Sequence, residues 1–219
     1  MMRFARVVSC VLFGLLAMSA RGQAQTPGAS DTSKFYVEFE TGASLGHKSS
    51  GFYGGEAGYR VWRNVAVFAE VGHQGNVGTS DLDAKAKTVA DAVGATSDAS
   101  YKITYYDFGA RYTPEITFGM VHPYAIVGFG GASVTAQTNF IVNGSVVPPE
   151  SLGIQTGSDL DGTVNKGYFM IGGGVTYAFG KRYFVDGSFR YGYVMKSSEI
   201  DSDSGISTVR ASIGVGVTF

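Results

Sequence analysis

Three histidines are the residues of this 219-residue chain best suited to act as general bases. Catalysis would require one of them to meet a nucleophile and an orienting acid. The strand pattern described below places His47 in a loop, His73 at the outer end of a strand and His122 near a turn at the opposite end. We therefore expect that the histidines do not converge, that no catalytic residue is present and that the chain is not an enzyme.

Carboxylate oxygens are a second possible source of chemistry, because they are the ligands that calcium prefers. Two acidic segments contain Asp159, Asp161, Glu199, Asp201 and Asp203. They lack the ligand spacing of a calcium loop, so we expect solvated acidic loops, no metal site and no cofactor. Glycine runs at 128–130 and 172–174 are not followed by a helical pattern, which favours strand glycines over phosphate loops.

The composition excludes two broad classes of protein. Apolar residues make up 44% of the chain and the net charge is only -1, which is incompatible with intrinsic disorder. Lys and Arg total 17 and form no extended basic run, so a nucleic-acid partner is not expected. The 32 glycines and the low charged fraction of 16% are also unusual for a soluble domain.

The first 24 residues have the pattern of a secretory signal peptide. A basic start over 1–6 precedes an apolar run over 7–20 and the small residues Gly22 and Ala24, and the run is too short to span a membrane. Cleavage after Ala24 would remove Cys10, the single cysteine, so we expect no disulfide. A lipoprotein box follows its apolar region, whereas most of the apolar run here comes after Cys10, so we expect no lipidation there. A polar lead-in follows over 25–33, and one domain over 34–219.

That domain alternates apolar and polar residues with a period of two in eight segments, which is typical of β-strands. The segments are 35–40, 53–61, 65–72, 105–112, 124–134, 169–179, 185–193 and 209–219. In the fifth segment both faces are apolar, so its inward face cannot be assigned from the sequence. In the last, every second residue from Val209 to Phe219 is apolar.

The position of the charged residues distinguishes a membrane barrel from a soluble one. Every segment that can be phased has one face without ionised groups, and that face carries most of the aromatic residues. An arginine facing lipid at mid-depth costs about 2–4 kcal/mol, so a bilayer would enforce this segregation. We therefore expect an all-β protein, a closed eight-stranded antiparallel transmembrane β-barrel, because only a closed barrel lets strands satisfy their backbone groups in lipid.

The charged residues then share the inward face, where we expect a lumen ion network. Its members are Glu38, Glu40, Glu56, Arg60, Glu70, Asp107, Arg111, Asp186, Arg190 and Arg210. The turn at 62–64 would place Glu56 opposite Glu70, a repulsive pair that needs cations. We expect Arg190 and Arg210 at mid-height with Glu40, Glu56, Glu70 and Asp107. A lower group would contain Glu38, Asp186, Arg60 and Arg111. Together these side chains should plug the barrel.

Connection lengths predict the orientation of the barrel. The connections at 62–64, 113–121 and 180–182 are short, whereas 74–100 and 135–166 are long and 195–206 is intermediate. Long loops of such barrels face outward and short turns face the periplasm. The loop at 45–50 is compact. Residues Leu82 to Val93 could form a short surface helix or remain a solvated coil.

The alternation that ends in Phe219 resembles the last strand of bacterial outer-membrane barrels. Strand number and size are similar to those of the OmpA transmembrane domain and the OmpX/Ail proteins. The resemblance implies a location in the bacterial outer membrane, contact with outer-membrane lipid and lipopolysaccharide, and a monomer with an unknown surface partner. It also implies that the barrel assembly machinery reads Ile213, Val215, Val217 and Phe219 as an assembly signal.

Three functions are compatible with such a barrel. The favoured interpretation is a non-enzymatic outer-membrane protein, structural or adhesive through its long surface loops. The alternatives are a small porin-like channel and a lipid A-modifying enzyme. Lipid A-modifying barrels place His and Ser near the outer rim, so His73 would be the only candidate base here.

Overall fold

The computed structural model describes residues 34–46, 48–116, 118–153, 160–196 and 205–219. The expected signal peptide (1–24) and lead-in (25–33), His47 and the acidic residues Asp159, Glu199, Asp201 and Asp203 lie outside these ranges. Within the described part, no helix is long and apolar enough to cross a membrane.

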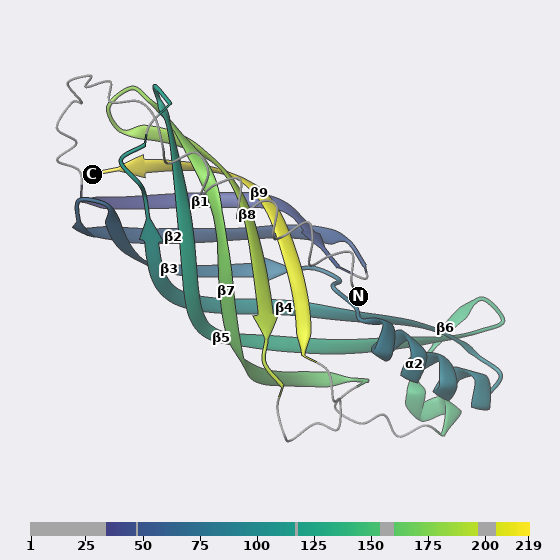
Figure 1. Cartoon of the computed structure of the whole chain (residues 1–219). Coiled ribbons are helices and arrows are strands. Elements are labelled where there is room, and N and C mark those ends of the chain that lie inside the picture. Colours follow the sequence, from purple (N-terminus) through teal and green to yellow (C-terminus); the bar gives the residue numbers. More distant parts are fainter. Residues whose placement is uncertain (1–33, 47, 117, 154–159, 197–204) are drawn as a thin grey trace, which may run out of the picture. The chain divides into compact units, whose positions relative to one another are not determined.

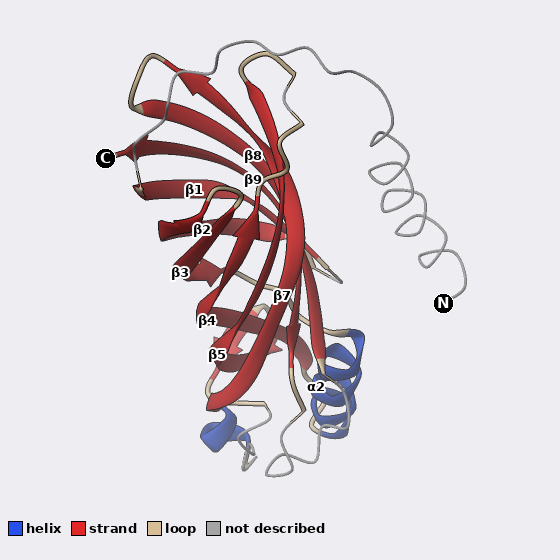
Figure 2. Cartoon of the chain, turned by 60° about the vertical axis from the view of Figure 1, so that its left-hand side comes forward, coloured by secondary structure: helices blue, strands red, loops and turns tan. Residues whose placement is uncertain are grey.

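Eight antiparallel strands close into a barrel, as the sequence predicts (Figures 1 and 2). They are β1 (Phe35–Leu45), β2 (Ser50–Trp62), β3 (Val65–Gln74), β4 (Thr96–Tyr112), β5 (Val121–Val142), β7 (Gly162–Phe179), β8 (Tyr183–Val194) and β9 (Ile206–Thr218). The sheet runs in the order β4-β3-β2-β1-β9-β8-β7-β5, and pairing of β4 with β5 closes it. The short strand β6 (Ser145–Val147) pairs only with the far end of β5.

The wall has the inside and outside faces that the alternation predicts. Phe39, Phe108 and Ile213 are 56%, 62% and 69% exposed on the outer face. The charged residues that alternate with such apolar residues along the strands are buried inside the barrel. The structure also resolves the fifth strand: Tyr124 and Ile126 are buried inside the barrel, and its alternate residues face outward. Because Tyr124 and Ile126 are themselves apolar, charge could not reveal this phase.

Three strands are much longer than expected from the sequence. Strands β4, β5 and β7 have 17, 22 and 18 residues, so parts of the expected long loops 74–100 and 135–166 are paired strand. Most outward residues of these extensions, such as Lys102, Thr135 and Asn165, are polar. The apolar alternation therefore ends where the membrane-facing wall ends, whereas backbone pairing continues.

A helix, α2 (Ser80–Ala92), occupies the connection between β3 and β4, so the helical alternative for this segment is correct. The side chain of its N-cap residue Thr79 accepts a hydrogen bond from the Leu82 backbone N–H. Leu82 and Ala86 are buried in a cluster with Ala99 of β4. Packing against the extended sheet thus stabilises a helix whose own apolar pattern is weak.

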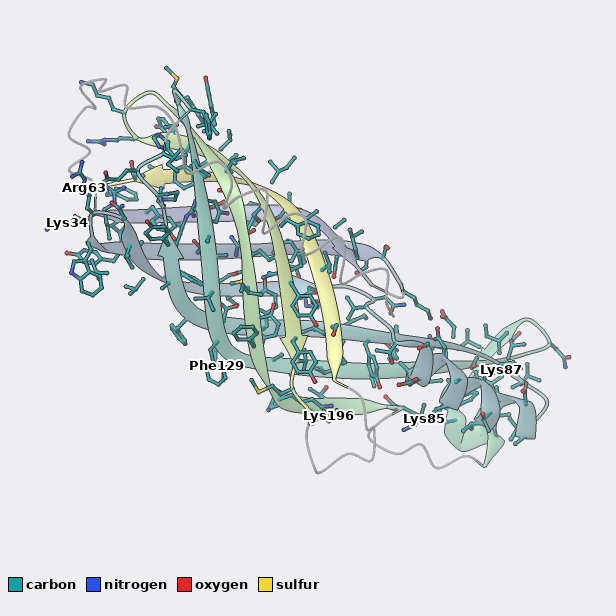
Figure 3. The ribbon with its side chains drawn as sticks, in the orientation of Figure 1. Lys34, Arg63, Lys85, Lys87, Phe129 and Lys196 are labelled. Carbon is teal, nitrogen blue, oxygen red and sulfur yellow. The ribbon has the colours of Figure 1, made fainter. Side chains whose placement is uncertain are left out.

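The two ends of the barrel differ. The short turns and the C-terminal end of β9 lie at one end, here named the short-turn end, and α2 and β6 lie at the other, the long-loop end (Figure 1). Lys34 and Arg63 lie at the short-turn end and Lys85 and Lys87 at the long-loop end, whereas Phe129 lies on the wall between them (Figure 3).

The last strand offers a direct test of which face meets lipid. Val215 is 56% exposed on the outer wall, whereas a Cβ on Gly214 would collide with the Glu38 carboxylate inside. We expect Val215→Arg to lower the free energy of unfolding in lipid bilayers by about 2–4 kcal/mol. Gly214→Arg should instead act through steric conflict in the lumen. Single cysteines at 214 and 215 would be probed with a lipid-soluble thiol reagent; equal labelling would contradict the assignment.

Candidate functional site

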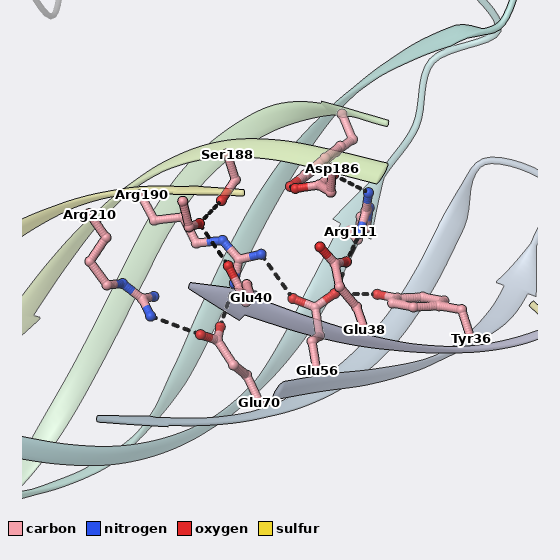
Figure 4. Close-up of polar contacts among 12 residues, drawn as sticks. Tyr36, Glu38, Glu40, Glu56, Glu70, Arg111, Asp186, Ser188, Arg190 and Arg210 are labelled. Carbon is pink, nitrogen blue, oxygen red and sulfur yellow. Dashed lines mark hydrogen bonds and ion pairs between the residues drawn. The ribbon is translucent and has the colours of Figure 1, made fainter. Parts of the chain in front are cut away.

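Alternating residues on six strands project charged side chains into the lumen (Figure 4). Nine of them are buried: Glu38 and Glu40 on β1, Glu56 on β2, Glu70 on β3, Asp107 and Arg111 on β4, Asp186 and Arg190 on β8, and Arg210 on β9. The period of two places each on the same inner face as its neighbours. We name these nine side chains the lumen cluster.

Arg190 is the centre of the lumen cluster. Its Nη1 atom lies 3.0 Å from Glu40 Oε1 and 2.6 Å from Glu70 Oε2, and its Nη2 atom lies 3.2 Å from Glu56 Oε2. Arg210 Nη1 lies 2.8 Å from Glu70 Oε1. Two guanidinium groups therefore hold three carboxylates from three neighbouring strands (Figure 4).

Arg111 organises a second group nearer the short-turn end. It lies 3.6 Å from Glu38, 3.5 Å from Glu56 and 3.2 Å from Asp186. Because Glu56 contacts both Arg111 and Arg190, the two groups form one continuous network. The expected division into a mid-height and a lower group is therefore less sharp in the structure.

Strand register creates the repulsion that the arginines relieve. Glu56 is directly opposite Glu70, as the sequence predicts, and Arg190 is directly opposite Arg210. Like charges on neighbouring strands destabilise each other when left alone. The pair of carboxylates and the pair of guanidinium groups face each other across the narrow lumen, and their attraction offsets the repulsion within each pair. The network therefore depends on closure of the barrel.

Two of the ten residues expected in the network have different surroundings. Asp107 is fully buried beside Glu70 in the register, but neither carboxylate oxygen has a hydrogen-bond partner in the described part of the chain. Arg60 is only partly buried near the short-turn end of β2, where its backbone N–H donates to the Lys34 carbonyl. The register between β2 and β3 shifts directly after it, between Arg60 and Trp62.

Inward-facing aromatic residues are the part of the site that charge patterning missed. The hydroxyl groups of Tyr105 and Tyr124 donate to Glu70 and Asp186, at 2.5 and 2.8 Å. The guanidinium carbon of Arg111 lies 3.5 Å from the centre of the Tyr124 ring, and that of Arg210 lies 4.5 Å from the Tyr105 ring. These contacts supply cation–π attraction and hydrogen bonds to charges that have left water. The sequence carried a signal for Tyr105, which shares the inward face of its strand with Asp107 and Arg111, but none for Tyr124, whose strand has no charged residue on either face.

Aromatic and aliphatic side chains fill the lumen on the long-loop side of the lumen cluster. The buried cluster there includes Phe52, Ile103, Tyr105, Tyr168 and Met170. The Phe52 and Tyr168 rings lie 6.4 and 4.9 Å from the Tyr105 ring. The lumen is therefore closed by an apolar layer as well as by ion pairs, and the sequence predicted only the ion pairs.

The positions of the carboxylates and of the histidines bear on metal binding and on catalysis. Carboxylate oxygens of Glu40, Glu56 and Glu70 lie within 4.8 Å of one another, a spacing that could suit a metal ion. The Arg190 guanidinium already contacts all three carboxylates, and so takes the place of a cation. Of the histidines, His73 lies on the outer wall, where its Nδ1 is 2.9 Å from Thr104 Oγ1. His122 is the second residue of β5, at the short-turn end of the barrel, so the two do not meet.

Comparison with known proteins is consistent with this architecture. A family model described as outer membrane protein beta-barrel domain matches residues 9–219. Neisserial surface protein A is similar, with a TM-score of 0.55 and 17% identity over 88% of this chain and 99% of that one. The N-terminal barrel domain of Pseudomonas aeruginosa OprF has a TM-score of 0.50 and 19% identity over 86% and 100%. No curated protein matches the chain.

Removing the central cation should expose the cost of the buried carboxylates. We expect Arg190→Met to lower the free energy of unfolding by about 3–5 kcal/mol, because Glu40, Glu56 and Glu70 would lose their shared partner. The double variant Arg190→Met/Glu70→Gln should lose less than the sum of the two single variants.

Urea-induced unfolding in lipid vesicles would measure these differences. Lys181→Met is the matched control, since it removes one positive charge from an exposed turn at the short-turn end. An Arg190→Met barrel as stable as the Lys181→Met barrel would contradict the assigned role of Arg190.

Proposed function

Because the chain belongs to the outer membrane protein beta-barrel domain family, we propose that it is a non-enzymatic outer-membrane protein that presents a built surface at its long-loop end to a partner outside the cell. We call this surface the outer platform. It comprises α2, β6 and the ends of β4, β5 and β7 that extend beyond the apolar wall. The outer platform is the observation that supports the proposal.

Contacts from two connections hold the outer platform in place. The Lys48 ammonium lies 2.6 Å from the Ala99 carbonyl oxygen and 3.0 Å from the Asp83 carboxylate, and so joins the first connection to α2 and β4. The Asn76 side chain accepts hydrogen bonds from the Gly78 and Tyr101 backbone N–H groups. A solvated loop would not need such contacts, whereas a binding surface benefits from being ordered in advance.

Two features of the lumen favour this role over a channel. The apolar layer around Tyr105 and Tyr168 closes the lumen on the long-loop side. Arg111, which lies between the Tyr36 and Tyr124 rings, narrows the lumen on the short-turn side. An eight-stranded barrel is just wide enough for its own side chains. The absence of enzymatic activity is part of the proposal; it is supported by the position of His73 on the outer wall, away from the lumen cluster.

Further parts of the proposal concern assembly and environment. Ile213 and Val215 are exposed on the outer face of β9, and Phe219 is 63% exposed beyond its end. This arrangement would leave them accessible to the barrel assembly machinery as an assembly signal together with Val217. We propose a monomeric barrel in outer-membrane lipid and lipopolysaccharide, with the long-loop end outward.

The test removes α2 from the outer platform without disturbing the wall. Residues 79–94, which contain α2, would be replaced by a short Gly/Ser linker in the full chain. Bacteria carrying wild-type or variant protein would be compared for attachment to surfaces coated with extracellular-matrix proteins and to one another. We expect the variant to reach normal surface levels but to lose the attachment that the wild-type protein confers.

A matched control alters the opposite end of the barrel. Arg63→Ala breaks an exposed ion pair with Glu115, 3.4 Å long, at the short-turn end, and should leave attachment unchanged. Undiminished attachment by the α2 replacement, at equal surface levels, would contradict the proposal that the outer platform carries the interaction.

A further inference from the structure

Three basic residues lie around the short-turn end of the lumen, opposite the outer platform. Lys34 is directly opposite Arg60, whose backbone N–H donates to the Lys34 carbonyl oxygen at 2.7 Å. The Lys34 N–H donates to the Phe219 carbonyl oxygen, and the Thr218 N–H donates to the Arg182 carbonyl oxygen at 2.8 Å. The last two residues of the chain therefore join Lys34 to Arg182. We name Lys34, Arg60 and Arg182 the basic rim.

Strand alternation places the basic rim on the inner side of the wall. Tyr36 and Phe184 face the lumen, where the Tyr36 hydroxyl donates to Glu56, and each lies two residues from a member of the basic rim. The intervening Phe35 and Tyr183 are 42% and 59% exposed on the outer face. The aromatic residues therefore meet the lipid interface, whereas the basic rim meets water at the end of the lumen.

Two aromatic rings close the lumen directly inside the basic rim. The Tyr36 and Phe184 rings lie 6.2 Å apart, edge to face. A Cβ on Gly58 would collide with the Tyr36 ring, and a Cβ on Gly216 would collide with the Phe184 ring. The two glycines thus leave room for the rings to lie across the lumen. A ligand at the basic rim therefore stays in contact with water and does not reach the lumen cluster.

The basic rim lacks acidic neighbours on the inner face. Between it and the lumen cluster, no inward position of the described strands carries a carboxylate. Neither Lys34 nor Arg182 forms an ion pair within the part of the chain that the structure describes. Glu115, exposed at the same end, lies 3.4 Å from Arg63. Lys34 and Arg60 repel each other as like charges on neighbouring strands, and a bound anion would offset that repulsion.

We propose that the basic rim binds the phosphate group of a small soluble molecule in the periplasm. Lys34 and Arg182 lie at the ends of β1 and β8, on either side of β9, and so about 10 Å apart, which is two strand spacings. Their long side chains meet on one phosphate, to which the guanidinium offers paired N–H donors and the ammonium a point charge. The two charges match a phosphate dianion, whereas chloride has one charge and no second oxygen for the paired donors.

A phospholipid headgroup would offer the same phosphate from a different direction. Lipid lies against the outer face, where Trp62 and Tyr183 are 72% and 59% exposed. The basic rim lies on the inner side of these residues, which a soluble phosphate reaches without leaving water. The inference goes beyond the proposed function and uses only its orientation, with the short-turn end in the periplasm.

The test measures phosphate binding to the purified full-length barrel in maltoside micelles by isothermal titration calorimetry. Chloride keeps the ionic strength constant, because exposed charge contacts are screened by salt. Inorganic phosphate and glycerol phosphate are the soluble probes, and short-chain phosphatidylglycerol supplies the same group on a lipid. We expect both soluble probes to bind and the lipid to bind more weakly. Arg182→Gln and Lys34→Gln should each weaken phosphate binding roughly fivefold, as expected for one exposed charge contact.

Two further variants separate the position of the charge from its amount and its shape. Lys87→Gln removes one positive charge from the exposed side of α2, at the long-loop end, and should leave phosphate affinity unchanged. Arg182→Lys keeps the charge but loses the paired donors, so it should restore only part of the affinity lost in Arg182→Gln. Thermal unfolding followed by circular dichroism would verify that all variants fold.

The proposal is overturned if Arg182→Gln and Lys34→Gln bind phosphate as tightly as the wild-type barrel. It is also overturned if Lys87→Gln weakens binding as much as they do, since net charge alone would then explain the binding. Tighter binding of phosphatidylglycerol than of glycerol phosphate would assign the basic rim to lipid instead. Micelles have no inner or outer side, and none of these measurements involves the outer platform. Failure of this inference can thus be distinguished from failure of the proposed function.

Discussion

The hydrocarbon of the membrane cannot accept ionised side chains on the wall, and this determines where the charged residues of the strands lie. Charged residues of the spanning strands turn inward, into a lumen barely wider than the side chains themselves. There they lose water, so each carboxylate must be compensated. Arg190 does this for Glu40, Glu56 and Glu70 at once, with contacts of 2.6–3.2 Å. The compensation acts between strands that are far apart in sequence, and so requires a closed barrel.

Beyond the membrane this constraint no longer applies, and the strands continue there with a different pattern of polar and apolar residues. In β4, β5 and β7 the outward face becomes mostly polar, the inward face carries apolar residues such as Ala99, Val134 and Phe140 in place of charged ones, and backbone pairing continues to Thr96, Val142 and Gly162. That apolar inner face is what α2 covers, through Leu82 and Ala86. The same ladder therefore supports two environments, a lipid-embedded wall and an ordered surface outside it. This continuity allows the proposed binding surface to be rigid although its connections are long.

Sequence periodicity predicted what the membrane enforces. The eight strands, the outward face of β9 and the opposition of Glu56 and Glu70 all follow from a period of two and a short turn. It could not phase β5, because Tyr124 and Ile126 place apolar groups on the inner face too. The periodicity underestimated the lengths of β4, β5 and β7, because the ends of these strands that extend beyond the wall lack its lipid-facing apolar pattern. The tyrosine contacts of Arg111 and Arg210 depend on distances across the lumen, which no local pattern contains.

Paired charges and an apolar layer together close the lumen. Single-molecule conductance in planar lipid bilayers tests this closure, with purified wild-type and Arg190→Met barrels each measured alone. Wild-type barrels should carry no sustained current, and Arg190→Met barrels should open transiently because the carboxylates of Glu40, Glu56 and Glu70 would repel one another. A stable, ion-conducting open state of the wild-type monomer would contradict it and would favour the channel alternative.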